Sequence, residues 1–414
     1  MTDIDSRNMR LIGHDTLNGH GGLGEGMSIQ IARDGRRILW LAHEGPPRNF
    51  TGLDVSDPRA MKVVVQTDLP HNRMRSNSLD VVGDLLAVAY QTLGAKGLGD
   101  PGLGMEPAGI ALFDIATPES PRQIGFFDCS GPHSMGVHQL WFVDGETIHF
   151  SGGAPDFEPR DRRDCQFYRS IDVRDPTRPR EIGRWWYPGT RKGDDAPPPP
   201  RHPRFDNAFR AHNTNVYPER PDRAYVAYLD GGMFILDISD PANPTPVTHW
   251  NPHPPYNGFM HTVLPLPERD LLIVTDESIR NSGEDWPKLT WIVDARVETN
   301  LVPIATLPMP PFGEFAPRGG RFGSHNVHEN QPRPQSFRSD QIVFAAMFSG
   351  GVRVYDIADP LQPTEIAHCV PPVPNGSPVG VVQVNDVYVD ERRIVYAAER
   401  FSGGIYALEI DVDL

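Results

Sequence analysis

Four histidines, His138, His212, His261 and His325, occupy the same position in a sequence repeat. Each opens an apolar segment that ends about six residues later in a polar turn. These turns are Asp144-Gly145, Pro218-Glu219, Pro267-Glu268 and Gln331-Pro332. Because neutral imidazole is the commonest metal ligand in proteins, histidines that recur at one register predict a shared metal site.

The other three repeats place Ser28, Asn77 and Asn385 at the same position. Four imidazoles without a thiolate suit one divalent transition metal ion, whereas magnesium and calcium prefer oxygen ligands. Fe(II) is the first choice, and Mn(II), Zn and Cu remain open. We expect the ion to lie toward the histidine side, so that the serine and asparagine side meets the substrate.

The second strands of several repeats end in acidic residues, which are predicted on the same face as the histidines. They are Glu44, Asp230, Glu277 and Glu399. A metal-bound imidazole usually donates its second N–H to a carboxylate or carbonyl, so these acids are expected beside the ligands or the substrate. For each of them alone, an ordinary turn residue is an equally good interpretation. Glu277, in the same repeat as His261, is the predicted general base.

His328 follows His325 in the segment SHNVHEN. Side chains alternate along a regular strand, so the two histidines are expected on opposite sides. His328 is therefore predicted as an accessory catalytic acid or base. It is also the alternative to His325 as the fourth metal ligand.

The histidines are embedded in a longer repeated phrase, in which an apolar strand ends in Asp-Ile or Asp-Val and is followed by Asp-Pro. Its anchoring acids recur at intervals of 53 to 65 residues and are Asp54, Asp114, Asp172, Asp237, Asp294, Asp356 and Glu409. A second strand pair precedes each phrase. Four strands per repeat predict an all-β, seven-bladed β-propeller with four antiparallel strands per blade, formed by one domain over residues 1–414.

The last repeat, residues 385–414, stops after its third strand. Residues 10–15 (RLIGHD) resemble the fourth strands RQIGFF and REIGRW of other repeats. We therefore expect the N-terminal strand to complete the last blade and to remove an exposed sheet edge.

In a propeller the innermost strands line a central channel, so the four histidines are predicted to meet at one mouth. Long segments are expected at the same mouth: 91–108, 152–167, 186–211, 250–260, 277–289 and 308–324. They carry aromatic residues and arginines, among them Arg210 and Arg321. This composition predicts a pocket for a small aromatic or apolar molecule with an anionic group, although loop aromatics also serve to anchor their own loops.

The phrase Asp-Ile-Ser-Asp-Pro after an apolar strand resembles the LVIVD-repeat β-propeller family over nearly the whole chain. The segments SHNVHEN and FSGGVRVYDIADP are similar to a cytoplasmic bacterial branch of that family. The resemblance implies the propeller fold, and it implies no activity, because propellers serve as enzymes, scaffolds and binding platforms.

Four blade histidines are also similar to the ligand set of the carotenoid-cleaving oxygenases, which hold ferrous iron; the similarity concerns the ligands and not the sequence. An oxidoreductase of the dioxygenase type is the first expectation. A lyase, isomerase or hydrolase that uses the ion as a Lewis acid, as in the propeller oligogalacturonate lyases, is the second. A propeller that only binds protein partners is the third.

The formal net charge of -15 argues against nucleic acid and anionic membranes as partners, because both attract basic surfaces. The N-terminal segment has no apolar core typical of a signal peptide, and no segment is long enough to span a membrane. The sequence therefore predicts a cytoplasmic protein that acts on a small molecule.

Overall fold

The computed structural model describes residues 4–92 and 107–412, and most of the predicted loop 91–108 lies outside this part. The described chain is almost entirely β-strand and loop, which confirms the all-β prediction. Its helical segments are single turns: η1 (Leu17–Gly19), η3 (Pro267–Arg269), α1 (Phe312–Phe315) and η4 (Ala316–Arg318). In the described residues no helix is long and apolar enough to cross a membrane.

Most strands belong to four-stranded antiparallel sheets, and three of these sheets are made of consecutive strands. One sheet contains β11 (Val137–Phe142), β12 (Thr147–Gly152), β13 (Phe167–Asp172) and β14 (Arg180–Trp185). The next contains β15 (Thr214–Tyr217), β16 (Arg220–Ala227), β17 (Met233–Asp237) and β18 (Thr245–Trp250). A third contains β19 (Met260–Leu266), β20 (Leu271–Asp276), β21 (Thr290–Asp294) and β22 (Val302–Thr306).

The eight strands from β3 to β10 form one larger sheet. One half is β3 (Leu23–Ile31), β4 (Arg37–His43), β5 (Arg48–Asp54) and β6 (Lys62–Asp68). The other half is β7 (Met74–Val82), β8 (Leu85–Thr92), β9 (Gly109–Asp114) and β10 (Arg122–Asp128). The two halves are joined through one pair of residues, His43 and Ser76.

Both N-terminal strands pair with strands from the end of the chain. β2 (Met9–Asp15) is the outer strand of a sheet with β28 (Ile405–Ile410), β27 (Ile394–Glu399) and β26 (Val384–Val389). β1 (Asp5–Arg7) pairs with β25 (Thr364–Val370), whose sheet continues through β24 (Val352–Asp356) and β23 (Ile342–Ala346). The sequence did not predict β1.

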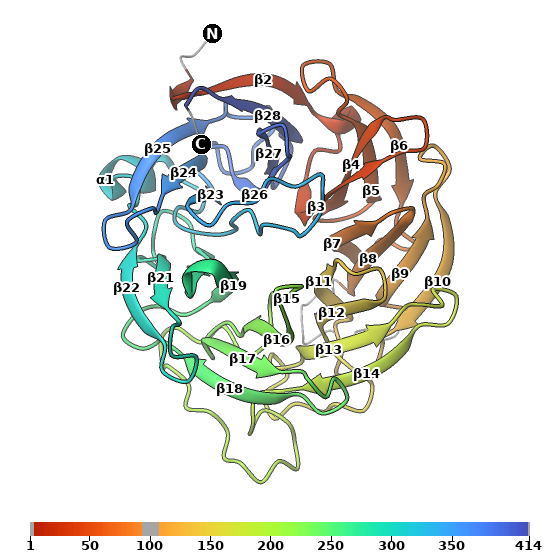
Figure 1. The fold of residues 1–414 in the computed structure, drawn as a ribbon, viewed down its shortest axis with the longest axis vertical. Helices are drawn as coiled ribbons and strands as arrows, with labels where there is room; N and C mark the ends of the chain where they lie inside the picture. Colours follow the sequence, from red (N-terminus) through yellow and green to blue (C-terminus); the bar gives the residue numbers. More distant parts are fainter. Residues whose placement is uncertain (1–3, 93–106, 413–414) are drawn as a thin grey trace.

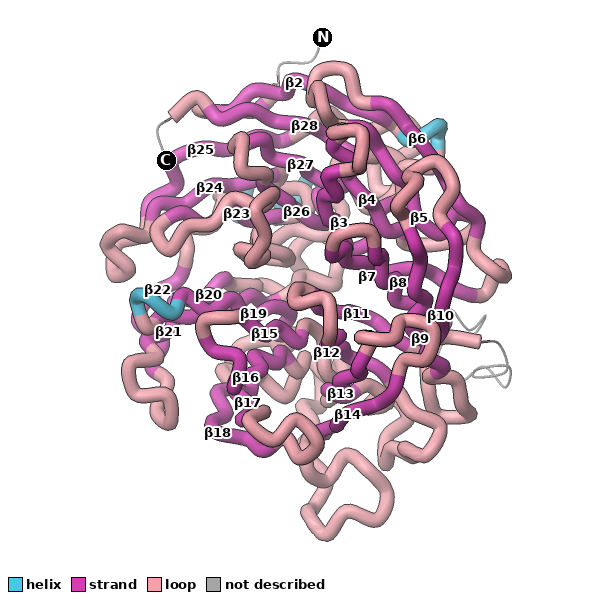
Figure 2. The backbone as a smooth tube through the Cα atoms, turned by 45° about the vertical axis from the view of Figure 1, so that its right-hand side comes forward, coloured by secondary structure: helices cyan, strands magenta, loops and turns pink. Residues whose placement is uncertain are grey.

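The sheets follow one another around a common centre (Figure 1). β3, β7, β11, β15, β19 and β26 lie near this centre, and β6, β10, β14, β18 and β22 lie on the outside. The tilted view in Figure 2 shows the same stacking of neighbouring sheets. Apolar side chains such as Val263, Ile273 and Ile292 are fully buried between the sheets and form the core.

The repeated Asp-Pro phrase forms a local turn in each sheet. The carboxylate of Asp54 accepts a hydrogen bond from the backbone N–H of Ser56, and Asp237 accepts the same bond from Ser239. This side-chain turn ends the third strand of these repeats, and the chain returns antiparallel as the fourth strand. The repeat therefore fixes where strands end, and it leaves the residues at the opposite strand ends free for a site.

Candidate functional site

The structure brings His138, His212, His261 and His325 into one buried cluster. The Nε2 atoms of His138 and His212 are 2.8 Å apart. The ring centroids of His212 and His261 are 3.8 Å apart, and those of His261 and His325 are 4.4 Å apart. Each imidazole thus contacts the next one, and the four form a continuous arc.

Two of the histidines occupy β-bulges. His138 lies at the register shift between Val137 and Gln139, and His261 lies at the shift between Met260 and Thr262. A bulge turns one side chain away from the regular alternation of the strand. Here it directs the imidazole toward the centre of the molecule.

Asn77 and Asn385 occupy the corresponding bulges of β7 and β26, so their register relation to the histidines is as predicted. The segment after His325 differs from the expected regular strand. It makes one isolated bridge, between Val327 and Ala345. The chain then leaves the sheet at Asn330, whose φ of +49° is incompatible with a continuing strand.

Each imidazole of the cluster uses Nδ1 for a hydrogen bond outside the arc. The partners are Gln91 Oε1 at 3.0 Å for His138, Asn213 Oδ1 at 2.9 Å for His212, Thr262 Oγ1 at 2.8 Å for His261 and the Asn385 carbonyl at 2.6 Å for His325. An oxygen of a carbonyl or amide only accepts, so Nδ1 carries the proton in His212 and His325, whereas His138 Nδ1 contacts both Gln91 Oε1 and Arg75 Nη2, the latter at 3.4 Å. The Nε2 atoms of His212 and His325 therefore point into the arc as bare lone pairs.

Burial reinforces this protonation state. It lowers the pKa of His212 to about 3 and, with the neighbouring His212, the pKa of His138 well below the ordinary value. Burial also lowers the pKa of His325, although Glu277 partly opposes the shift. His138, His212 and His325 are therefore neutral at neutral pH, which is the form that binds metal ions.

Glu25 completes the cluster, and the sequence did not predict it. Its Oε2 atom is 3.4 Å from His261 Nε2 and 3.8 Å from His212 Nε2, and its Oε1 atom is 3.5 Å from His325 Nε2. Burial alone would raise the pKa of Glu25, but the contacts with His261 and His325 hold it well below the ordinary value. Within the described residues, Glu25 Oε2 and the Nε2 atoms of His261 and His325 have no hydrogen-bond partner.

The position of Glu25 results from an insertion in β3. Leu23 pairs with His43 and Met27 pairs with Leu41, so β3 has two more residues than its partner in this interval. Glu25 projects from the insertion between two glycines. A Cβ on Gly24 would lie 2.4 Å from the Asn77 carbonyl oxygen, so only glycine allows this close approach. The sequence feature that could have revealed Glu25 is therefore the segment Gly24-Glu25-Gly26 inside a strand.

Glu277 lies against the cluster as predicted for a residue next to the ligands. Its Oε1 atom is 3.6 Å from His325 Nε2 and 2.6 Å from Arg321 Nη1. Burial raises the pKa of Glu277, but His325 and Arg321 outweigh this effect and lower it to about 2. Two groups of residues have a geometry that can hold a metal ion. One is Glu25 with His212 and His261, and the other is His261 with Glu277 and His325.

The other predicted acids are placed differently. Glu44 binds Arg75 and Arg400 at 2.5 and 2.6 Å. Glu399 accepts hydrogen bonds from the backbone N–H groups of Phe401, Ser402 and Gly403, and Asp230 binds the backbone N–H and side chain of Asn207. Ser28 accepts a hydrogen bond from Arg333 in place of facing the arc.

Both ring nitrogens of His328 bind the main chain. Nε2 donates to the Phe337 carbonyl at 2.7 Å, and Nδ1 accepts from the Val389 N–H at 3.2 Å. Burial lowers the pKa of His328 to about 4. His328 therefore connects three segments of the chain, and His325 is the histidine that reaches the arc.

Most of the loop aromatics pack on one another. Trp286 stacks on Phe322 with ring centroids 5.6 Å apart, and Trp186 contacts Phe157 and Phe167. The aromatic rings that reach the histidines are Phe348, stacked 4.5 Å from His325, and Phe259, 6.3 Å from His212. Aromatic contact with the site thus comes from residues close to the cluster.

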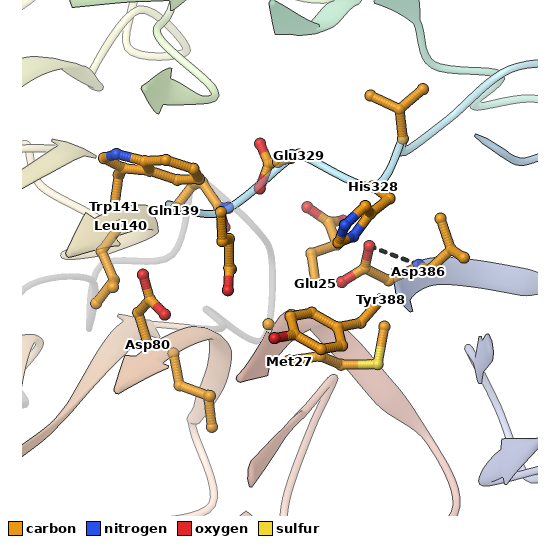
Figure 3. Close-up of a pocket in the computed structure, with 15 residues that line it drawn as sticks. Glu25, Met27, Asp80, Gln139, Leu140, Trp141, His328, Glu329, Asp386 and Tyr388 are labelled. Carbon is orange, nitrogen blue, oxygen red and sulfur yellow. Dashed lines mark hydrogen bonds between the residues drawn. The ribbon is translucent and has the colours of Figure 1, made fainter. Parts of the chain in front are cut away.

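Below the arc lies a small polar cavity of about 20 Å³, enough for one or two water molecules (Figure 3). It is lined by Glu25, Asp80, Gln139, Glu329, Asp386 and Tyr388, among others. Glu25 therefore lies between the histidine arc and this cavity. The cavity is too small for an organic molecule.

Glu329 predicts a pH-dependent stability. Burial raises its pKa from 4.5 to about 7, although the amides of Asn213 and Asn215 donate to its carboxylate at 2.6 and 2.8 Å. Between these pH values the folded protein keeps a proton that the unfolded chain releases. The contribution of Glu329 to the free energy of unfolding should therefore be complete below pH 4.5. It should be lost as the pH rises toward 7, by about 1.4 kcal/mol per pH unit at most.

Denaturant unfolding between pH 5 and 7 would measure this slope. Glu329→Gln keeps the hydrogen-bonding shape and removes the titration, so its slope should be smaller than that of the wild type. An unchanged slope would show that Glu329 does not titrate in this range.

The fold and the cluster define an all-β protein of repeated four-stranded sheets with a buried His-Glu site. Residues 222–251, which span most of β16, β17 and β18, match the family described as LVIVD repeat. No curated protein matches the chain. The crystal structure of the computationally designed Ika8 protein covers 97% of this chain and 100% of its own chain, with 9% identity and a TM-score of 0.50. This likeness concerns the fold alone.

Proposed function

We propose that this chain is an enzyme that holds one divalent transition metal ion in the arc of His138, His212, His261 and His325. The observation that carries the proposal is the convergence of bare Nε2 atoms and a buried carboxylate oxygen without hydrogen-bond donors between them. Unpaired buried acceptors are costly, and a cation is the partner that satisfies all of them together.

The distances between neighbouring members of the arc agree with ligands around an ion, whereas His138 belongs to neither of the two groups that can hold one. Metal bonds to imidazole and carboxylate are about 2.0 to 2.2 Å long, so neighbouring ligand atoms lie roughly 3 Å apart. The 2.8 Å between His138 and His212, and the 3.4 and 3.5 Å between Glu25 and its histidines, fall near this spacing. His325, and not His328, is the fourth imidazole in this proposal.

We further propose that the sheets form a seven-bladed propeller. The eight-stranded sheet counts as two blades, because its halves are joined through the single pair of His43 and Ser76. In this interpretation β2 completes the last blade. The histidines then come from blades three to six and meet at one mouth of the ring.

Four imidazoles and Glu25 favour a metal such as Fe(II), Mn(II), Zn or Cu, with Fe(II) as our first choice. Such an ion would supply an open position for redox chemistry of the dioxygenase type. As the alternative, it would act as a Lewis acid in a lyase, isomerase or hydrolase reaction. We propose Glu277, which lies beside His325, as the acceptor of a proton from a bound small organic molecule.

Metal analysis tests the proposal directly. Protein purified without a histidine tag should contain about one equivalent of a transition metal by inductively coupled plasma mass spectrometry. Less than roughly 0.2 equivalents, with no uptake on adding Fe(II), Mn(II) or Zn, would contradict it and favour a propeller that only binds partners. If iron is present, binding of nitric oxide detected by electron paramagnetic resonance would favour the dioxygenase type over Lewis-acid chemistry.

A further inference from the structure

Four arginines surround the arc at the ends of the strands that carry it. Arg75 lies two residues before Asn77, Arg210 lies two residues before His212, Arg321 lies four residues before His325, and Arg400 directly follows β27. We call these residues the arginine ring. All four are partly buried.

Three members of the ring have carboxylate partners. Arg75 and Arg400 share Glu44, and together these residues form a belt across the side of the site that has no histidine. Arg400 also donates to Asn385 Oδ1 at 2.8 Å. Arg321 binds Glu277.

Arg210 is different, because no group among residues 4–92 and 107–412 pairs with its guanidinium. Its backbone is fixed, since the N–H and carbonyl of the next residue, Ala211, bond to Gln166. Gln166 in turn accepts from Gln91, whose Oε1 atom binds both His138 and Arg75. The Arg210 backbone is therefore tied to a network that includes a proposed ligand, and its positive charge lies close enough to His138 to help lower the pKa of that imidazole.

The charges of the site are unbalanced. The carboxylates in contact with the arc or the arginine ring are Glu25, Glu44 and Glu277. Among these contacting groups, four guanidinium groups against three carboxylates leave one positive charge, and a divalent ion would raise the excess to three. Asp164 and Glu399 lie farther out and act on Arg210 and Arg400. A partly buried site with this excess attracts an anion, and a planar guanidinium binds carboxylate and phosphate groups in a bidentate manner.

We infer that the substrate of this site is an organic anion whose carboxylate or phosphate group is held by Arg210, with Arg75 beside it, while its reacting part faces the histidine arc. The inference rests on the proposed metal site for the reacting part. The anion-binding part stands on the arginine ring alone. Phe259 and Phe348 offer apolar contact for a ring or chain attached to the acidic group.

Calorimetric titration of the full-length, metal-analysed protein tests the inference with three probes of similar shape: benzoate, phenyl phosphate and neutral benzamide. We expect at least one anion to bind and benzamide not to bind. Arg210→Gln should weaken the binding of that anion about tenfold or more. Arg180→Gln, which changes an exposed arginine at the start of β14, is the matched control and should leave the affinity unchanged.

The outcomes separate the two proposals. Tighter binding of benzoate identifies a carboxylate substrate, and tighter binding of phenyl phosphate identifies a phosphate substrate. Equal affinity of the wild type and Arg210→Gln for both anions, or binding of neither, overturns the inference even if one metal is bound per chain. Anion binding that depends on Arg210 in a protein without metal would instead support the anion site and contradict the metal proposal.

Discussion

His261→Ala should lower the affinity for the metal ion by at least about 100-fold, because replacing even an outer partner of a ligand costs tenfold to 100-fold. His261 is the central imidazole of the arc and belongs to both groups that can hold an ion. Its side chain is fully buried and contacts Thr262, the neighbouring imidazoles of the arc and Glu25. Metal content after dialysis, with competitive titration against a chelator, would measure the change.

His328→Ala is the matched control for this variant. It removes a buried histidine of the same segment as His325, but one whose two nitrogens bind Phe337 and Val389. Metal content should stay at the level of the wild type, while the free energy of unfolding should fall by about 2 to 4 kcal/mol through loss of two hydrogen bonds and buried volume. Loss of metal in His328→Ala and its retention in His261→Ala would contradict the assignment of the arc.

The sequence predicted the convergence of the histidines because their spacing follows the strand register. His138 and His261 project from bulges at the same point of their strands, so aligned sequence positions became neighbouring positions in space. The polar turn of each repeat set this alignment. The same logic placed Asn77 and Asn385 correctly in the remaining bulges.

Glu25 was missed for the same reason that the histidines were found. The alignment assumed an equal length for each strand, whereas β3 has two extra residues between Leu23 and Met27. This assumption selected Ser28, which pairs regularly with Trp40. The bulge lies before the turn from which positions were counted. Counting back from the turn therefore cannot reveal the two extra residues.

The sequence also could not separate a loop aromatic that meets a substrate from one that anchors its loop. Trp286 and Phe322 are separated by more than thirty residues and stack on each other. Such pairing depends on the fold of several loops together. The sequence also did not predict β1, the partner of β25, because three residues are too few to show the alternation of a strand.

Removal of the metal should lower the midpoint of thermal unfolding of the wild type, because the ion binds the folded arc and the unfolded chain has no such site. An ion at about 1,000 times its dissociation constant stabilises the folded state by about 4 kcal/mol. Without it, the Nε2 atoms of His138 and His212 face each other at 2.8 Å, and the Nε2 atoms of His261 and His325 have no hydrogen-bond partner among the described residues. Calorimetry with and without a chelator would measure the difference.

Glu25→Gln should make this difference smaller. Glutamine keeps the shape of the side chain but removes the negative charge that lies 3.4 Å from His261 Nε2, so metal binding should weaken about tenfold to 100-fold. The stabilisation by metal then falls by about 1.4 to 2.8 kcal/mol at the same free metal concentration. Glu399→Gln is the control, because Glu399 is equally buried but binds the backbone N–H groups of residues 401 to 403. That variant should lower the unfolding midpoint by the same amount with and without the chelator, and an equal response of both variants would show that the Glu25 carboxylate is not a metal ligand.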